Sequence, residues 1–261
     1  MVRNTKLVSL LGVLALAIAA VLVAAAGATP PSGPTLTGVP SANTRSAGYA
    51  PPSVLSPELS QTVVAQGATK LENPAALTSY YGYDNDVLNS AGQPQMLPTP
   101  SSPTEAHKTE PDKNTYLVFK KGLDGADPSY DYGTHFLYQG HEGGANGAGY
   151  ITRINLDADA AHRVTLMATE DSNGKALSTI DGSTWDPWAK RLIFTTENTG
   201  APTYAMGADY PAAVTDVSGA LGRGGYEGMQ DDSDGNLWIA EDVGGSNKPG
   251  SKARKHAVPL N

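Results

Sequence analysis

Three short segments of this chain share one pattern, an apolar run typical of a β-strand that ends in acidic, amide or imidazole side chains and then glycine. The clearest runs from Gly235 to Gly245, where the tight-turn dipeptide Asp234-Gly235 precedes Leu-Trp-Ile-Ala and two acids. The other two span residues 137–142 and 193–198. Strands that each deliver a polar group at the same end gather those groups at one point. The repeat therefore predicts β-structure built around a shared site.

Aligning the three segments on their aromatic residue places oxygen or nitrogen donors at two consecutive positions. The donors are Glu241, Glu197 and His141 at the first position and Asp242, Asn198 and Glu142 at the second. Buried carboxylates that converge repel one another unless a cation neutralises them. Glu227, in a glycine-rich loop, is a further candidate ligand on the same side. We therefore predict a metal site whose ligands are His141, Glu142, Glu197, Glu227, Glu241 and Asp242. The alternative is that these acids are exposed loop residues.

The composition favours calcium as the ion. The chain has a formal net charge of −8 and no cysteine, which excludes disulfides, thiol catalysis and zinc–thiolate sites. Calcium is a hard cation that prefers oxygen ligands, which the clustered acids supply. No basic stripe is present, so nucleic acid is not an expected partner.

The N-terminal part predicts export. Arg3 and Lys6 precede an apolar run that ends in small residues at Ala28, the order of a secretory signal. We expect cleavage after Ala28 and a secreted, periplasmic or cell-envelope location. The alternative is an uncleaved membrane anchor, because the run is long enough to cross a bilayer. Residues 29–112 carry thirteen of the nineteen prolines and predict a linker or a loosely docked arm.

Residues 113–261 predict an all-β domain of short strands separated by turns. The clearest strand candidates are Asn114–Lys120, His135–Gln139, Gly149–Leu156, Arg163–Ala168, Arg191–Thr196 and the run that follows Gly235. A β-propeller fits best, since the innermost strands of its blades bring equivalent residues to a central channel. We expect the repeated segments to be those innermost strands. A β-sandwich is the alternative. The strands suffice for about two to three blades. We therefore expect this chain to be a piece of a larger propeller, or to need other copies to complete one.

Several of these motifs resemble those of PhoX-type bacterial alkaline phosphatases. Gln139-Gly140-His141-Glu142 resembles the family's Asn-His-Glu, the run from Thr184 to Asn198 resembles its Thr-Pro-Trp-Gly-Thr…Thr-Cys-Glu-Glu, and Gly222 to Glu227 is similar to its Gly-Arg…His-Glu. The order along the chain agrees, over about Tyr116 to Gly245. The resemblance implies an exported six-bladed propeller that holds calcium and iron and hydrolyses phosphate monoesters of small molecules.

The resemblance also assigns roles to residues. It implies calcium ligation by Glu142, Glu197, Glu227 and Glu241. The family's iron-ligating cysteine falls at Thr196, its second glutamate at Asn198 and its histidine at Tyr226, which leaves iron and activity open. Arg223 is the candidate catalytic residue, stabilising charge on the transferred phosphoryl group; the alternative is a solvated loop arginine. Two other functions stay open: a non-catalytic calcium-binding propeller, and a calcium-dependent esterase or lactonase.

Overall fold

The computed structural model describes residues 33, 35–39, 55–67, 69–241 and 254–256. The predicted signal segment and Asp242 lie outside these residues. The chain divides into two compact units, Met1–Thr62 and Val63–Asn261. In the first unit the backbone N–H of Thr37 donates to Glu58 Oε2 at 3.0 Å. No helix among the described residues is both long and apolar enough to span a membrane.

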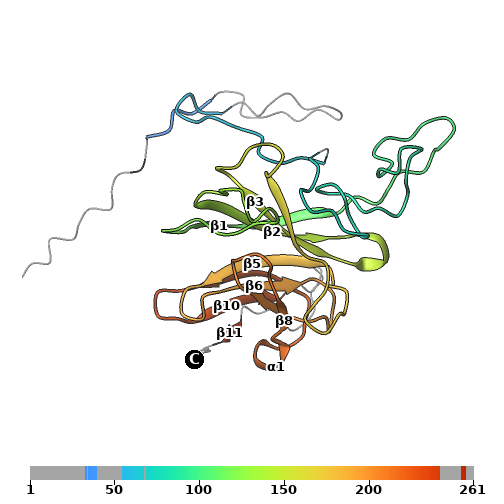
Figure 1. Cartoon of the computed structure of the whole chain (residues 1–261). Coiled ribbons are helices and arrows are strands. Elements are labelled where there is room, and N and C mark those ends of the chain that lie inside the picture. Colours follow the sequence, from blue (N-terminus) through green and yellow to red (C-terminus); the bar gives the residue numbers. More distant parts are fainter. Residues whose placement is uncertain (1–32, 34, 40–54, 68, 242–253, 257–261) are drawn as a thin grey trace, which may run out of the picture. The chain divides into compact units, whose positions relative to one another are not determined.

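The second unit is all-β, as predicted: its described residues form three antiparallel sheets joined by turns and two single-turn helices (Figure 1). Sheet one contains β1 (Glu110–Val118), β2 (His135–Glu142), β3 (Tyr150–Asn155) and β4 (Val164–Ala168). Sheet two contains β5 (Ile180–Asp186), β6 (Arg191–Thr196), β7 (Tyr204–Met206) and β8 (Val214–Asp216). Sheet three contains β9 (Tyr226–Asp231), β10 (Leu237–Glu241) and β11 (Arg254–His256). The helices are η1 (Ala145–Gly147) and α1 (Ser218–Leu221).

Each sheet is an up-and-down meander, because its strands pair in the order in which they follow one another in the chain. The sheets stack face to face, also in chain order (Figure 1). Phe136 and Phe194 belong to the apolar core between sheets one and two, and Ile193 and Ile239 to the core between sheets two and three. Successive residues of β6 thus serve opposite cores, since side chains alternate along a strand.

The arm, which we define as residues 63–109 apart from residue 68, covers the other face of sheet one. Leu71 and Tyr81 are buried there against Tyr150 and Ile154. The backbone N–H of Gly82 donates to the Tyr150 hydroxyl at 3.0 Å. This segment falls in the region for which we predicted a linker or a loosely docked arm, and it supplies one wall of a buried core.

The first strands of the three sheets lie next to one another: β1 contacts β5, and β5 contacts β9. We expected the strands of the repeated segments to be the ones that meet, and the contacts among β1, β5 and β9 differ from that expectation. Those segments form β2, β6 and β10, the second strand of each sheet. The strands that meet are β1 and two that we did not predict, β5 and β9.

Candidate metal centre

The same irregularity occurs in β1, β5 and β9. In each, two residues of the first strand lie opposite one residue of the second, which is the arrangement of a β-bulge. The two adjacent residues that form each bulge are Asp112-Lys113 in β1, Asp181-Gly182 in β5 and Glu227-Gly228 in β9. An acid therefore stands first in all three. Bulges re-aim side chains, and here the three acids of the bulges line one cavity.

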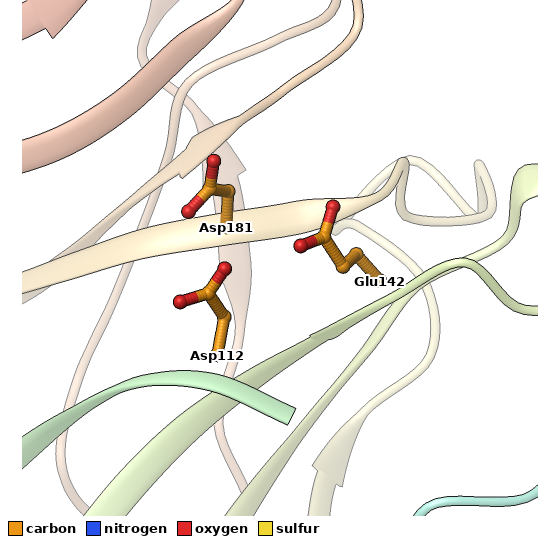
Figure 2. Close-up of side chains that lie close together, drawn as sticks. All are labelled: Asp112, Glu142 and Asp181. Atoms are coloured by element: carbon orange, nitrogen blue, oxygen red, sulfur yellow. The ribbon is translucent and has the colours of Figure 1, made fainter. Parts of the chain in front are cut away.

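These bulges surround a cavity of about 280 Å³, lined by all six bulge residues and Ala240. Glu142, the last residue of β2, joins Asp112 and Asp181 beside it. Each of these three side chains offers an oxygen within 4.8 Å of the other two. Figure 2 shows their carboxylates gathered where β1, β2 and β5 come together. Such a separation fits ligands of one shared ion.

Two more acids belong to this cluster. Glu142 hydrogen bonds with Glu197, which directly follows β6. The negative charges of Glu197 and Glu227 both act on Asp181 and raise its pKa. Asp181 is only 4% exposed, Asp112 and Glu142 are half-buried, and Glu197 and Glu227 are exposed. The five-acid cluster thus has a buried base and a rim open to water.

The proximity of these acids disfavours their charged forms. Burial raises the pKa of Glu142 to about 9, and hydrogen bonds with Glu197 and Asp112 act in the same direction. Burial likewise raises the pKa of Asp181 to about 8, together with the hydrogen bond and charge of Asp112. Without a counter-ion, the cluster must therefore retain protons at neutral pH or bear the repulsion.

Glycine allows the close approach of β5 and β9 that brings their acids together. A Cβ atom on Gly182 would lie 1.8 Å from the Glu227 backbone oxygen, far inside contact distance. The Thr195 hydroxyl accepts the Gly182 N–H at 2.9 Å and donates to the Glu227 carbonyl at 2.8 Å. One side chain from β6 thereby fixes the positions of two bulges.

A corresponding contact joins β5 to β1. The Ser183 hydroxyl donates to the Lys113 carbonyl oxygen at 3.0 Å, and its oxygen lies 2.8 Å from the Thr115 hydroxyl. Strands β1, β5 and β9 are therefore held together by buried hydroxyls rather than by a ladder of backbone hydrogen bonds. This arrangement fixes the backbone positions of the bulges that carry the acids.

Of the residues predicted from the sequence, Glu142 offers an oxygen within 4.8 Å of oxygens of Asp112 and Asp181, Glu197 hydrogen bonds with Glu142, and Glu227 lines the adjoining cavity. It places His141 elsewhere, on the opposite face of β2 beneath the arm. The ring is fully buried, and its nitrogens lie 3.1 Å from the Thr109 hydroxyl and 2.9 Å from the Thr152 hydroxyl. Burial lowers the pKa of His141 to about 3, so the ring is a neutral core group. We therefore leave His141 out of the candidate centre.

Of the remaining predicted residues, the structure describes Glu241 and Arg223. Glu241 lies at the end of β10, opposite Tyr226 in the strand register. Asp242 lies outside the described residues. Arg223 forms an ion pair with Asp216 and lines a different, larger cavity. The structure thus gives no support to a role for Arg223 beside the acids.

Sequence reasoning missed Asp112 and Asp181. A signal for Asp181 is present: an apolar or aromatic residue, an acid and a glycine occur together in Ile180-Asp181-Gly182 and again in Tyr226-Glu227-Gly228. The same pattern also occurs in Leu123-Asp124-Gly125, outside the cluster, so it does not single out the site in a chain with 29 glycines. Asp112 has no following glycine, and only the register of β1 against β2 shows that it is equivalent.

Comparison with known proteins identifies no relative, since neither a family model nor a curated protein matches this chain.

Proposed function

We propose that this protein binds calcium at the five-acid cluster. The observation that carries the proposal is the threefold bulge, which directs Asp112, Asp181 and Glu227 to one cavity beside Glu142 and Glu197. All five donors are carboxylates, and calcium takes six to eight oxygen ligands in flexible geometry. Carboxylates that bind through both oxygens, with water from the open rim, satisfy that number. A bound cation also removes the repulsion among the acids.

We further propose that the three sheets are consecutive blades of a β-propeller. Each sheet is a meander, its first strand meets the first strand of the next sheet, and the same bulge recurs at the same place. This arrangement is the one in which inner strands of successive blades line an axial channel. The cluster would then lie on the channel. Export through residues 1–28, proposed from the sequence, suits a protein that takes calcium from its surroundings.

The melting temperature of the full chain across pH tests calcium binding. Because Glu142 and Asp181 have folded-state pKa values above their unfolded values, the metal-free fold binds more protons than the unfolded chain between about pH 4 and pH 9. Their contribution to stability is present below about pH 4 and is lost as pH rises through 8 to 9. In chelator, the melting temperature should therefore fall from pH 7 to pH 9.

Saturating calcium should remove this loss, because the ion stabilises the ionised carboxylates. At a concentration 100-fold above the dissociation constant, a ligand adds about 2.7 kcal/mol, or roughly 5–10 °C for a domain of this size. The gap between the calcium and chelator curves should widen towards pH 9. Curves that coincide at every pH would rule out calcium binding.

A second candidate function is hydrolysis of phosphate monoesters at the same centre. The motif resemblance favours it, and so does the cavity, which offers room for a phosphate group next to the proposed ligands. Bound calcium would supply positive charge to the phosphate oxygens. Thr196 and Tyr226, at the family's cysteine and histidine positions, serve the fold: Thr196 donates to the Pro202 carbonyl at 2.9 Å, and Tyr226 packs in a core. We therefore propose calcium without iron.

Release of phosphate from an aryl phosphate tests this second function. We expect turnover with calcium, none in chelator, and none in Asp181→Asn, whereas Asp234→Asn, which changes an exposed turn acid, should keep full activity. Calcium-loaded wild-type protein that releases no phosphate would eliminate the enzyme while leaving calcium binding in place.

A further inference from the structure

A second cavity, of about 750 Å³, has no residue in common with the five-acid cluster. Its walls come from the arm, the η1 turn, the segment before β5, the β6–β7 loop and the loop before β9. The volume lies within the range typical of small-molecule sites. Leu77, Leu177 and Pro202 form part of its lining and provide apolar surface. The cavity can therefore take the apolar body of a small organic molecule.

The charged groups that a ligand can reach in this cavity are mainly cationic. Lys175 and Arg223 line it and are both exposed. Among the described residues, no carboxylate lies within ion-pair distance of the Lys175 ammonium group. Arg223 pairs with Asp216 through Nη2, and a guanidinium carries further N–H donors. Two cations thus face a cavity in a chain whose net charge is negative.

Two acids also line the cavity, Asp84 and Asp86. Asp84 is fully buried and presents no accessible surface. Asp86 is paired with His107, and that hydrogen bond and charge raise the pKa of His107. The exposed Asn146 and Thr199 add neutral hydrogen-bonding groups. The accessible pattern is two cations, the exposed Asp86 paired with His107, neutral polar groups and apolar walls.

The backbone of Lys175 is also held in place. Lys175 follows the Asn173-Gly174 turn, its backbone N–H donates to Asp171 Oδ1 at 3.1 Å, and its carbonyl oxygen accepts the Asp171 N–H at 2.8 Å. The backbone is therefore fixed while the side chain has no ion-pair partner among the described residues. Binding an anion therefore orders the Lys175 side chain but requires no further ordering of its backbone.

We propose that this cavity binds a small organic anion, a carboxylate or a phosphate ester with an apolar body, through Lys175 and Arg223. Such a site is separate from the calcium centre and does not depend on it. It also gives Arg223 a role other than the catalytic one predicted from the sequence. Both anion types share the chemistry that the two cations recognise.

Calorimetric titration of the full chain with benzoate and with phenyl phosphate tests the site, with benzyl alcohol as the uncharged analogue. The titrations are run in chelator at pH 6, where Glu142 and Asp181 retain their protons and the metal-free fold is stable. We expect saturable binding of at least one anion, with a dissociation constant on the order of 1 mM or below, and none of the alcohol. Binding of one anion alone identifies its source as carboxylate or phosphate.

Substitutions of Lys175 and Arg223 test whether the anion binds in this cavity. Lys175→Met and Arg223→Met should each weaken it about tenfold, since a charged hydrogen bond contributes about 1.5 kcal/mol or more. Lys121→Met, at an exposed position outside the cavity lining, should bind as the wild type does. Circular dichroism melting checks that each variant is folded. The proposal is overturned if neither anion saturates, if the alcohol binds as well, or if folded Lys175→Met retains wild-type affinity. None of these outcomes bears on calcium binding.

Discussion

Replacing Asp181 by asparagine is expected to abolish the stabilisation by calcium and, at the same time, to stabilise the metal-free protein at pH 8. Asp181 is the most buried of the five acids, at 4% exposure, and its carboxylate lies among four others. Asparagine keeps the size of the side chain and removes its charge. The two effects have opposite signs, and a residue that served only the packing of the fold would not produce both.

The expected magnitudes are large. Burial, followed by the hydrogen bond and charge of Asp112, raises the pKa of Asp181, and each pKa unit corresponds to about 1.4 kcal/mol. Removing this buried charge should therefore stabilise the metal-free fold by about 2 kcal/mol or more at pH 8. Calcium affinity should fall at least about tenfold, because affinity follows the number of charged ligands. Thermal melting with and without calcium measures both effects. Asp234→Asn is the matched control and should change neither, while a metal-free Asp181→Asn protein that is less stable than the wild type would contradict the account.

Replacing Gly182 by alanine is expected to destabilise the protein by more than about 3 kcal/mol and to weaken calcium binding. The added Cβ would lie 1.8 Å from the Glu227 carbonyl oxygen and 2.5 Å from the Thr195 hydroxyl oxygen. The first of these is a backbone atom in a neighbouring strand and cannot rotate away. Strands β5 and β9 must separate, and Glu227 then moves away from Asp181.

Gly228 provides the control for this change. It occupies the same position in the bulge of β9, yet a Cβ there would meet no atom within 4 Å. Gly228→Ala should therefore have little effect, and chemical denaturation of the two variants measures the difference. Equal stability of Gly182→Ala and Gly228→Ala would show that the close approach of β5 and β9 does not hold the site together.

The second strands of the sheets could be predicted from the sequence because their patterns are strong. Arg191–Thr196 was predicted with the bounds that the structure shows, since a run of apolar and β-branched residues lies between turn signals. Of the first strands, β1 was predicted in part, as Asn114–Lys120, whereas β5 and β9 could not be predicted. Ile180–Asp186 and Tyr226–Asp231 contain acids and glycine because they form the site and its close contacts, and these residues are depleted in ordinary strands.

The candidate site was predicted in part for the same reason. Glu142 and Glu197 follow readable strands and could be found, whereas Asp112 and Asp181 lie in bulges that only the strand register reveals. His141 shows the effect of a shift by one residue along a strand. It precedes Glu142 on β2, so its side chain points to the opposite face and enters the core beneath the arm. A pattern of polar residues after a strand does not determine which of two neighbours faces the site.

Calorimetric titration of the chelator-treated full chain with calcium at pH 8 is the most direct test of the central claim that the five clustered acids share a cation. We predict saturable binding of at least one calcium ion per chain, which is lost or strongly weakened in Asp181→Asn and unchanged in Asp234→Asn. A folded wild-type protein that shows no saturable binding, or binding that Asp181→Asn leaves intact, would contradict it.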